Sequence, residues 1–434
     1  MKRLPNKLAL LDSCFLVPLL LVVSITSSNP IQGSDIFEEI VVTASLLQSD
    51  SQSVSVTFVD ETDLRNRGAV HAEDILSKVP NVIGSGGASR NRFFQIRGIG
   101  ERSQFVEPVN PSVGILLDGI DMSGAGGALT LFDIQQLEVL RGPQGTIMGA
   151  NALAGLINLR SAATDIPVGE ILIGTEQFGG HRISARVSKI ASNGLAARLA
   201  VQKYHSDGFV NNSWLNREDT NSRSELTSRG SIKWAGSNNV VEGAVYYIRT
   251  NNGYDAFSLD NTRTTLSDQP GEDDLTLRAG RTVWRRQLGA YSSLIQLSHA
   301  EISTTYSYDE DWSFMGIAPG WEYSSFDQYL RNRDMSSIEA RLQSDADLSE
   351  WITGFYMRNE TEDLLRKYTY LPRPFESDIK TITLAAFGQA NRAINDQLKA
   401  FLGIRLENRD SDYEDNAGVN NTFENSYWTG RTGI

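Results

Sequence analysis

Apolar and polar side chains alternate along the C-terminal two thirds of this chain. From residue 168 onward, segments of roughly ten residues show this alternation and are separated by turns. The run 398–407 is typical, because its even positions are Leu, Ala, Leu, Ile and Leu, while Lys, Arg and Glu stand among its odd positions. One face of such a strand suits lipid and the other suits water, which indicates a transmembrane barrel. We expect further strands near 180–190, 195–204, 225–234, 240–249, 337–343, 351–360 and 381–391.

The connections between these segments are alternately short and long. Residues 191–194 and 236–239 are short, whereas 250–283 and 309–335 are long and acidic, as periplasmic turns and outer loops would be. A soluble β-sandwich or propeller would also have period-two strands and stays an alternative. Aromatic residues near the segment ends favour an interfacial girdle: Tyr204, Trp214, Trp234, Tyr246, Tyr247, Trp351 and Tyr356.

Residues 52–165 follow a different, glycine-rich pattern that predicts a compact α+β domain. A strand is expected at 54–59, and a short helix at 72–79 has acidic residues in its first turn and stops at Pro80. Further strands are predicted at 93–97, 113–117 and 137–141. The dipeptide Asp118-Gly119 indicates a tight turn after the second of these.

The first 51 residues divide into two segments. Residues 1–33 have basic residues before the apolar stretch 15–23 and then a polar tract, which is typical of an export signal peptide. A membrane anchor is the alternative, but the stretch is shorter than the roughly 20 residues needed to span a bilayer. Residues 34–51 are polar and contain one β-prone island at 40–44.

Composition and charge exclude several classes of function. With 40% hydrophobic and 21% charged residues, the chain is neither a helical membrane bundle nor mainly disordered. A formal net charge of -13 argues against a nucleic-acid partner. Cys14 is the single cysteine and lies in the signal segment, and the four histidines fit no zinc spacing. We therefore expect no cofactor, no metal site and no enzymatic activity.

Four ordered sequence blocks carry a resemblance to a known family. They read DILSKVPNV at 74–82, FQIRG at 94–98, VGILLDG at 113–119 and IQQLEVLRGPQGTIMGANALAGLIN at 134–158. Together they resemble the plug domain of TonB-dependent outer-membrane receptors of the iron-complex or siderophore type. The resemblance covers about a quarter of the chain, from its N-terminal portion, and identifies residues 52–165 as the plug.

The resemblance implies a plug followed by an antiparallel transmembrane β-barrel of the 22-stranded class. Barrel diameter grows with strand number, and a lumen that holds a globular plug requires a barrel of this size. Residues 166–434 have room for about half of those strands. The last seven residues, 428–434, look like the beginning of a strand. We therefore expect a truncated barrel that does not close by itself.

The β-prone island resembles the TonB box of this family. An unfolded strand beside a plug is suited to pairing with the edge of another sheet, here the periplasmic domain of TonB, which the ExbB-ExbD complex energises. An ordinary disordered linker is the alternative. The residues expected to bind TonB are Glu39, Ile40, Val41, Val42, Thr43 and Ala44.

Two arginines end plug strands within the family motifs. The resemblance implies that Arg97 and Arg141 lock the plug against carboxylates of the barrel wall, with Glu138 positioned to orient one of them. Gly98 and Gly142 follow the two arginines and allow tight turns at this seam. Pairing with acids inside the plug is the alternative.

The resemblance also places the ligand on the outward loops of the plug and on the inner barrel wall. Arginines in these loops could hold an anionic iron chelate, and an aromatic ring could stack on it. Solvated loop charges are the alternative. The candidate ligand contacts are Ser89, Arg90, Arg92, Arg102, Gln104 and Phe105.

The predicted function is TonB-dependent active transport of a scarce nutrient, an iron complex such as a ferric siderophore, across the bacterial outer membrane. Cobalamin, haem and oligosaccharides stay open as substrates. We expect a monomer that contacts outer-membrane lipid and lipopolysaccharide, with its coupling segment in the periplasm. A passive porin or adhesion barrel with a structural plug, and a soluble exported enzyme, are the alternatives from other classes.

Overall fold

The computed structural model describes residues 55–85, 88–103, 106, 108, 110–346, 349–395 and 398–434. The predicted signal segment, the predicted TonB box and the candidate ligand residues Gln104 and Phe105 lie outside the described residues. The described part contains an N-terminal domain, residues 55–161, and a large strand wall, residues 169–433. The connection between them spans residues 162–168, where the sequence places the domain boundary.

The N-terminal domain is built on a mixed five-stranded sheet of order β1-β6-β7-β4-β5, in which β4 and β7 are parallel. A second sheet pairs β2 with β3. The strands of the whole domain are β1 (Ser55–Asp60), β2 (Val82–Ser85), β3 (Phe93–Ile96), β4 (Val113–Leu117), β5 (Ile120–Asp121), β6 (Ile134–Arg141) and β7 (Gly155–Ser161). Its helices are α1 (Glu61–Asn66), α2 (Glu73–Leu76) and α3 (Gly145–Met148), with 3-10 turns η1 (Gly126–Ala128) and η2 (Gly149–Ala152).

Local sequence signals explain the start of α1 and the β4–β5 turn. Asp60 caps α1 by accepting a hydrogen bond from the Asp63 backbone N–H at 2.8 Å. Asp118 and Gly119 have φ angles of 50° and 83°, the left-handed values that a tight hairpin turn requires. The predicted turn is therefore confirmed. The predicted helix at 72–79 is wrong in length, because α2 ends at Leu76 and turns continue to Val79.

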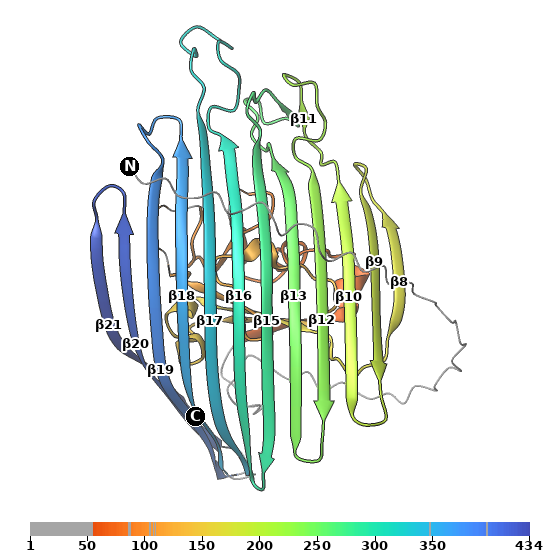
Figure 1. Ribbon diagram of the computed structural model, residues 1–434, viewed down its shortest axis with the longest axis vertical. Coiled ribbons are helices and arrows are strands. Elements are labelled where there is room, and N and C mark those ends of the chain that lie inside the picture. The colour runs from red at the N-terminus through yellow and green to blue at the C-terminus, as the bar shows by residue number, and fades with distance from the viewer. Residues whose placement is uncertain are drawn as a thin grey trace, which may run out of the picture. The chain divides into compact units, whose positions relative to one another are not determined.

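The wall is a twelve-stranded sheet in which each strand pairs antiparallel with its sequence neighbour, from β8 at one edge to β21 at the other. Figure 1 shows these strands side by side, from yellow to dark blue. They are β8 (Gly169–Thr175), β9 (His181–Ile190), β10 (Leu195–Ser206), β12 (Arg223–Ala235), β13 (Asn239–Tyr254), β15 (Gly271–Leu288), β16 (Tyr291–Asp309), β17 (Phe326–Ala346), β18 (Ser349–Tyr368), β19 (Phe375–Asn395), β20 (Leu398–Asp415) and β21 (Asn420–Gly433). A small parallel pair, β11 (Asn211–Asn212) with β14 (Thr264–Thr265), joins two long loops.

The alternating side-chain pattern is confirmed on β20. Leu402, Ile404 and Leu406 are 64%, 47% and 56% exposed, whereas Arg405 and Glu407 point to the other face and are buried. The two long loops are shorter than predicted: β13 continues to Tyr254 and β15 begins at Gly271, while β17 begins at Phe326. The outward residues of these extensions are mostly polar, so hydrophobic alternation did not reveal them as strands.

The hydrophobic core is shared between the domain and the wall. Leu137, Val139 and Leu159 have no exposed surface, and the same cluster includes Ile248 of β13 and Leu277 of β15. Each such aliphatic side chain contributes roughly 1.5–3 kcal/mol when it is fully buried. Apolar packing therefore holds the domain against the inward face of the wall.

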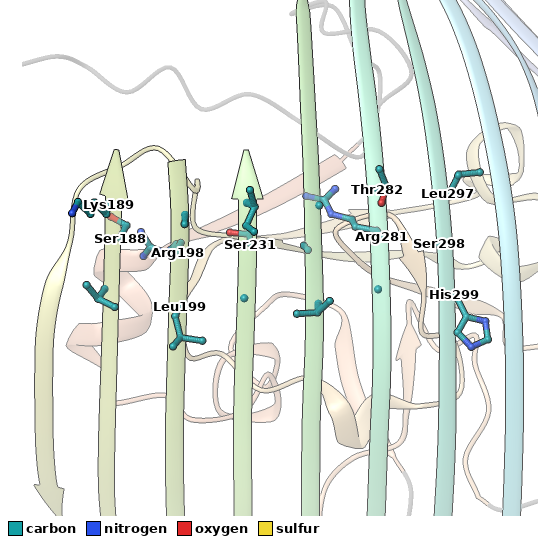
Figure 2. A pocket seen from close by; sticks show the side chains of 18 residues that line it. Ser188, Lys189, Arg198, Leu199, Ser231, Arg281, Thr282, Leu297, Ser298 and His299 are labelled. Atoms are coloured by element: carbon teal, nitrogen blue, oxygen red, sulfur yellow. The ribbon is translucent and has the colours of Figure 1, made fainter. Parts of the chain in front are cut away.

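The outward face of the wall has a shallow apolar groove of about 890 Å³ across β9 to β16. Gly230, Gly243 and Gly280 line it where larger side chains would fill it. Figure 2 shows Leu199 and Leu297 on two of its strands, with His299 further along β16. In the part of the chain that the structure describes, no helix combines the length and apolar character needed to cross a membrane.

Candidate functional site at the interface between the N-terminal domain and the wall

Arg90 forms the most deeply buried ion pairs of the interface. It lies in the connection between β2 and β3 and is 2% exposed. Its Nε and Nη2 donate to the two carboxylate oxygens of Glu225 on β12, at 2.7 and 3.0 Å, and its Nη1 donates to Glu73 on α2 at 2.6 Å. This bidentate geometry is the strongest that an arginine and a carboxylate can form. It fixes the β2–β3 connection to the wall.

Asp273 of β15 binds the residues on both sides of Arg90. Its Oδ2 accepts hydrogen bonds from the Ser89 N–H at 2.8 Å and from the Ser89 hydroxyl at 2.7 Å. Its Oδ1 accepts from Nε of Arg92 at 3.2 Å, and the Arg92 guanidinium lies 5.0 Å from the ring centre of Tyr306. Asp273 and Glu225 therefore hold one four-residue segment of the domain from two different wall strands.

The protonation of this cluster follows from burial and from its charges. Burial would lower the pKa of Arg90, but Glu225 and Glu73 outweigh that effect and raise it. Burial would raise the pKa of Glu73, but His71, Arg90 and Arg223 together hold it below its usual range. Burial and then Arg90 lower the pKa of His71, whose Nε2 lies 3.0 Å from the Gly126 carbonyl oxygen. At neutral pH the two ion pairs are charged and His71 is neutral.

A second cluster surrounds Asp133 at the start of β6. Arg198 of β10 donates to Asp133 through Nε at 2.8 Å and through Nη2, and both side chains are buried. Arg186 of β9 lies 3.5 Å from Asp133 and 2.6 Å from Glu61 of α1. Two neighbouring wall strands thus neutralise acids of the domain.

Two further contacts are centred on the β4–β5 hairpin. The hydroxyl of Tyr246 on β13 donates to Asp118 at 2.7 Å. Asp121 forms a buried ion pair with Arg358 of β18. Burial would raise the pKa of Asp121, but Arg358 and Ser123 hold it below its usual range. Arg65 of α1 also pairs with Glu170 of β8, so the ion pairs between domain and wall reach from β8 across the sheet to β18.

The predicted locking arginines contact the domain itself. Arg141 donates to the Ser55 hydroxyl at 2.8 Å and to Thr57, because β6 pairs with β1 in a register that places Ser55 opposite Arg141. Arg97 is exposed, and its guanidinium lies beside Gly142 of the same domain. A Cβ built on Gly142 would be 3.6 Å from Nη1 of Arg97. Among the described residues, neither arginine forms an ion pair with a wall carboxylate. Arg90 and Arg92 are the arginines of the domain that pair with acids of the described wall, and the locking role of Arg97 and Arg141 stays a prediction.

The remaining residues of the predicted seam also lie within the domain. Glu138 has no exposed surface and accepts hydrogen bonds from Gln136 at 2.8 Å and from Asn158 at 3.3 Å. Gly98 has a φ of 80° and Gly142 a φ of 111°, so both adopt the turn conformation that glycine favours.

The predicted ligand residues divide into two groups. Ser89, Arg90 and Arg92 are buried against the wall and bonded to Asp273, Glu225 and Glu73, and their contact with a ligand stays a prediction. Arg102 is exposed on the loop before β4 and stays a candidate. No local sequence signal could have separated the two groups, since Glu225 and Asp273 lie 135 and 183 residues from Arg90.

Sequence reasoning missed an aromatic cluster near the long-loop end of the wall. Tyr254, Tyr306 and Tyr329 are buried together with Leu364. Arg366 lies 5.1 Å from the Tyr329 ring centre and donates to Asp327 at 2.9 and 2.8 Å. The signal was distributed over separate strands, because the three buried tyrosines come from β13, β16 and β17 and the leucine comes from β18.

The described residues bring together one group that could ligate a metal. His299, Glu301 and Asp334 are exposed on the outward wall face, with His299 Nε2 at 3.7 and 3.6 Å from the two carboxylates. Exposed groups of this kind are common without a metal. The histidine spacing in the sequence did not reveal it, because its ligands come from two strands.

Comparison with known proteins places this geometry in context. Residues 47–156 match the family model described as TonB-dependent Receptor Plug Domain. The chain is 24% identical over 389 residues to the pesticin receptor of Yersinia pestis, covering 85% of this chain and 55% of that protein. It therefore spans about half the length of the curated relatives that it matches.

Solved structures show the same fold. The ferric yersiniabactin uptake receptor of Yersinia pestis superimposes with a TM-score of 0.71 at 19% identity, covering 87% of this chain and 61% of that one. The open form of a ferric-catecholate import receptor of E. coli K12 superimposes with a TM-score of 0.68 at 16% identity, covering 88% and 66%. The α+β domain and the antiparallel wall together have the plug-and-barrel fold of these receptors.

Proposed function

We propose, from the premise that this chain carries the plug domain and the fold of the TonB-dependent receptors, that it takes up an iron complex across the bacterial outer membrane. The N-terminal domain is the plug, and the inward face of the wall is the surface that it blocks. The apolar outward face of the wall contacts lipid and lipopolysaccharide, and the protein acts as a monomer.

The observation that carries this proposal is the set of buried ion pairs between plug and wall. Breaking one buried pair by removal of a partner costs about 3–5 kcal/mol, because it leaves a buried charge without compensation. Each 1.4 kcal/mol corresponds to about a tenfold change in an equilibrium. Thermal separation of several such pairs at once is therefore very rare. A plug held this tightly would block diffusion through a passive porin. An energised transporter, in contrast, requires a resting state in which the plug closes the barrel.

The energy is supplied through the predicted coupling strand, Glu39 to Ala44. It pairs with an edge strand of TonB, which the ExbB-ExbD complex drives, and each backbone hydrogen bond contributes about 1 kcal/mol net. Such a joint is strong enough to transmit a pull and weak enough to release. Its position in the sequence, directly before the plug, directs that pull onto the plug.

The substrate is proposed to be an anionic ferric chelate. The solved relatives named above bind ferric yersiniabactin and ferric catecholate, and both cargoes are iron complexes. Arg102 is an exposed cation on an irregular plug loop and can contact a chelate that enters between the long loops of the wall.

Uptake of radioactive iron tests the function directly. The complete protein is expressed in an iron-starved strain that lacks its own ferric receptors, and a panel of ferric chelates is supplied. Val42→Pro should reduce uptake to background while leaving surface binding intact, because proline removes a backbone donor and bends the strand. Ser49→Pro, in the same polar segment but outside the island, is the matched control. Uptake that continues unchanged in Val42→Pro would show passive flux and would refute the proposal.

A further inference from the structure

A cavity of about 750 Å³ lies between the plug and the wall, at the end of the wall where the turns are short. Its lining comes from the plug strands β4 and β7 and from wall strands β10 to β18. The cavity is on the opposite side of the plug from the long loops. Its volume falls in the range of about 300–1,000 Å³ that small-molecule sites occupy.

Arginines converge on one side of this cavity. Arg160 comes from β7 of the plug, Arg281 and Arg285 from β15 and Arg341 from β17, and all four line it. The charges of Arg281, Arg160 and Arg341 all act on Arg285, so the four guanidinium groups are electrostatic neighbours. Clustered like charges repel unless anions lie among them.

Five carboxylates line the cavity against seven cationic side chains, so the lining keeps an excess of positive charge. The five acids are Asp118, Asp133, Asp165, Glu242 and Glu350. Glu242 lies 2.7 Å from Arg281 and 4.0 Å from Arg285, and Arg341 pairs with Glu339. The side chain of Arg160 forms no hydrogen bond or ion pair with any residue that the structure describes, although its backbone belongs to the ladder between β6 and β7. The side chain of Arg160 therefore has all its donors left for a ligand, and Arg285 has only Glu242, at 4.0 Å, as an acidic partner. Arg281 adds a buried Nε that has no hydrogen-bond partner among the described residues.

A fifth arginine adds buried positive charge to the same cavity. Arg229 of β12 is 5% exposed and lines the cavity wall. Its two Nη atoms donate to the carbonyl oxygens of Phe132 and Thr130, at 2.5 and 2.7 Å. Its Nε is buried without a hydrogen-bond partner among the described residues. Carbonyl oxygens carry no formal charge, so these two bonds do not neutralise the guanidinium, and Asp118 and Asp133 are the acids whose charges act on it.

We propose that this cavity is a second, periplasm-side binding site for carboxylate-bearing small molecules, through which the anionic chelate passes after it leaves the outer loops. This inference rests on the proposed function and specifies the route. Arg160 and Arg285 bind a carboxylate of the ligand from the plug side and from the wall side. Since one of the two belongs to the plug, rearrangement of the plug separates them and releases the ligand.

Citrate, a small tricarboxylate, is the probe for binding to the purified complete protein. Isothermal titration calorimetry is carried out with sodium citrate, against sodium chloride at matched ionic strength. We expect one citrate site per chain, at least tenfold weakened in Arg160→Gln/Arg285→Gln and unchanged in Arg278→Gln. Arg278 lies on the same strand as Arg285 but is exposed on the outward face, where it pairs with Glu301 at 3.7 Å. Absence of citrate binding, or equal binding in the wild type and the double variant, would overturn the proposal.

Uptake by cells tests the role in transport. The double variant should bind the chelate at the cell surface as the wild type does, but its initial uptake rate should fall at least fivefold. A normal uptake rate in a folded double variant would also overturn the proposal, even if citrate binds. If the wild type takes up no ferric chelate at all, the proposed function fails, whereas the calorimetric result still decides whether the anion site exists.

Discussion

Removing Arg90 should release the β2–β3 connection of the plug from the wall. In Arg90→Met the methionine keeps most of the side-chain volume but loses three charged hydrogen bonds, two to Glu225 and one to Glu73. Glu225 is 2% exposed, so water cannot replace the lost partner without opening the interface. The variant therefore tests whether the buried ion pairs hold the plug closed.

The size of the effect follows from the burial of the two partners. Loss of one partner of a buried pair costs about 3–5 kcal/mol, compared with about 0–1 kcal/mol for an exposed pair. With a urea dependence of about 2 kcal/mol per molar for a domain of this size, a loss of about 4 kcal/mol lowers the midpoint of plug unfolding by about 2 M. Arg90→Met/Glu225→Leu should recover part of this loss, because it leaves no carboxylate of Glu225 unpaired.

The assay follows the plug separately from the wall. A fluorescent label on Thr62→Cys, an exposed position in α1, reports plug unfolding in urea, in a background that carries Cys14→Ser. Arg217→Met is the matched control, because Arg217 pairs with Asp219 at 2.8 Å with about half of each side chain exposed. A midpoint shift for Arg90→Met no larger than that of the control would refute the reasoning.

Three further predictions concern the plug and its contacts. The pKa of His71 is lowered in the fold from its unfolded value of 6.5, so its contribution to the free energy of unfolding is complete above pH 6.5 and is lost as pH falls below that value. The urea midpoint of plug unfolding should therefore decrease between pH 7.5 and pH 5.5. In His71→Gln this decrease near pH 6 should be smaller. Gly149→Ala should loosen the plug, measured as faster protease cleavage, because Gly149 has a φ of 68° and its added Cβ would collide with the Glu407 carboxylate. Asp121→Asn should lower plug stability by about 3 kcal/mol in the urea assay, because the buried Arg358 loses the closer of its two carboxylate partners and keeps only Glu360 at 3.4 Å; a loss below 1 kcal/mol would contradict this.

Part of the fold could be predicted because it depends on local sequence. The predicted strand at 113–117 is β4 as observed, and Asp118-Gly119 forms its turn. The strands at 181–190 and 195–206 also match their predicted positions closely. The strands β2, β7, β8, β15 and β16 were missed, although β15 and β16 contain 18 and 19 residues. Residues 428–434, predicted as the beginning of a strand, form the end of β21. The outward residues of β15 and β16 change between apolar and polar along each strand, so a single hydrophobic period did not describe these two strands.

Local sequence was enough to predict the fold class of this chain, because alternation, turn residues and the plug motifs are all properties of neighbouring residues. It also predicted the turn conformation of Gly98 and Gly142, which is a local property of the backbone. The tertiary structure alone decided which arginines meet which acids. Arg90 pairs with Glu225, 135 residues away, because the fold brings a plug loop against β12. Arg141, which carried the stronger motif, meets hydroxyls of its own sheet because strand register places Ser55 beside it. Charge complementarity over such separations depends on how the plug packs against the wall, and no local pattern encodes that packing.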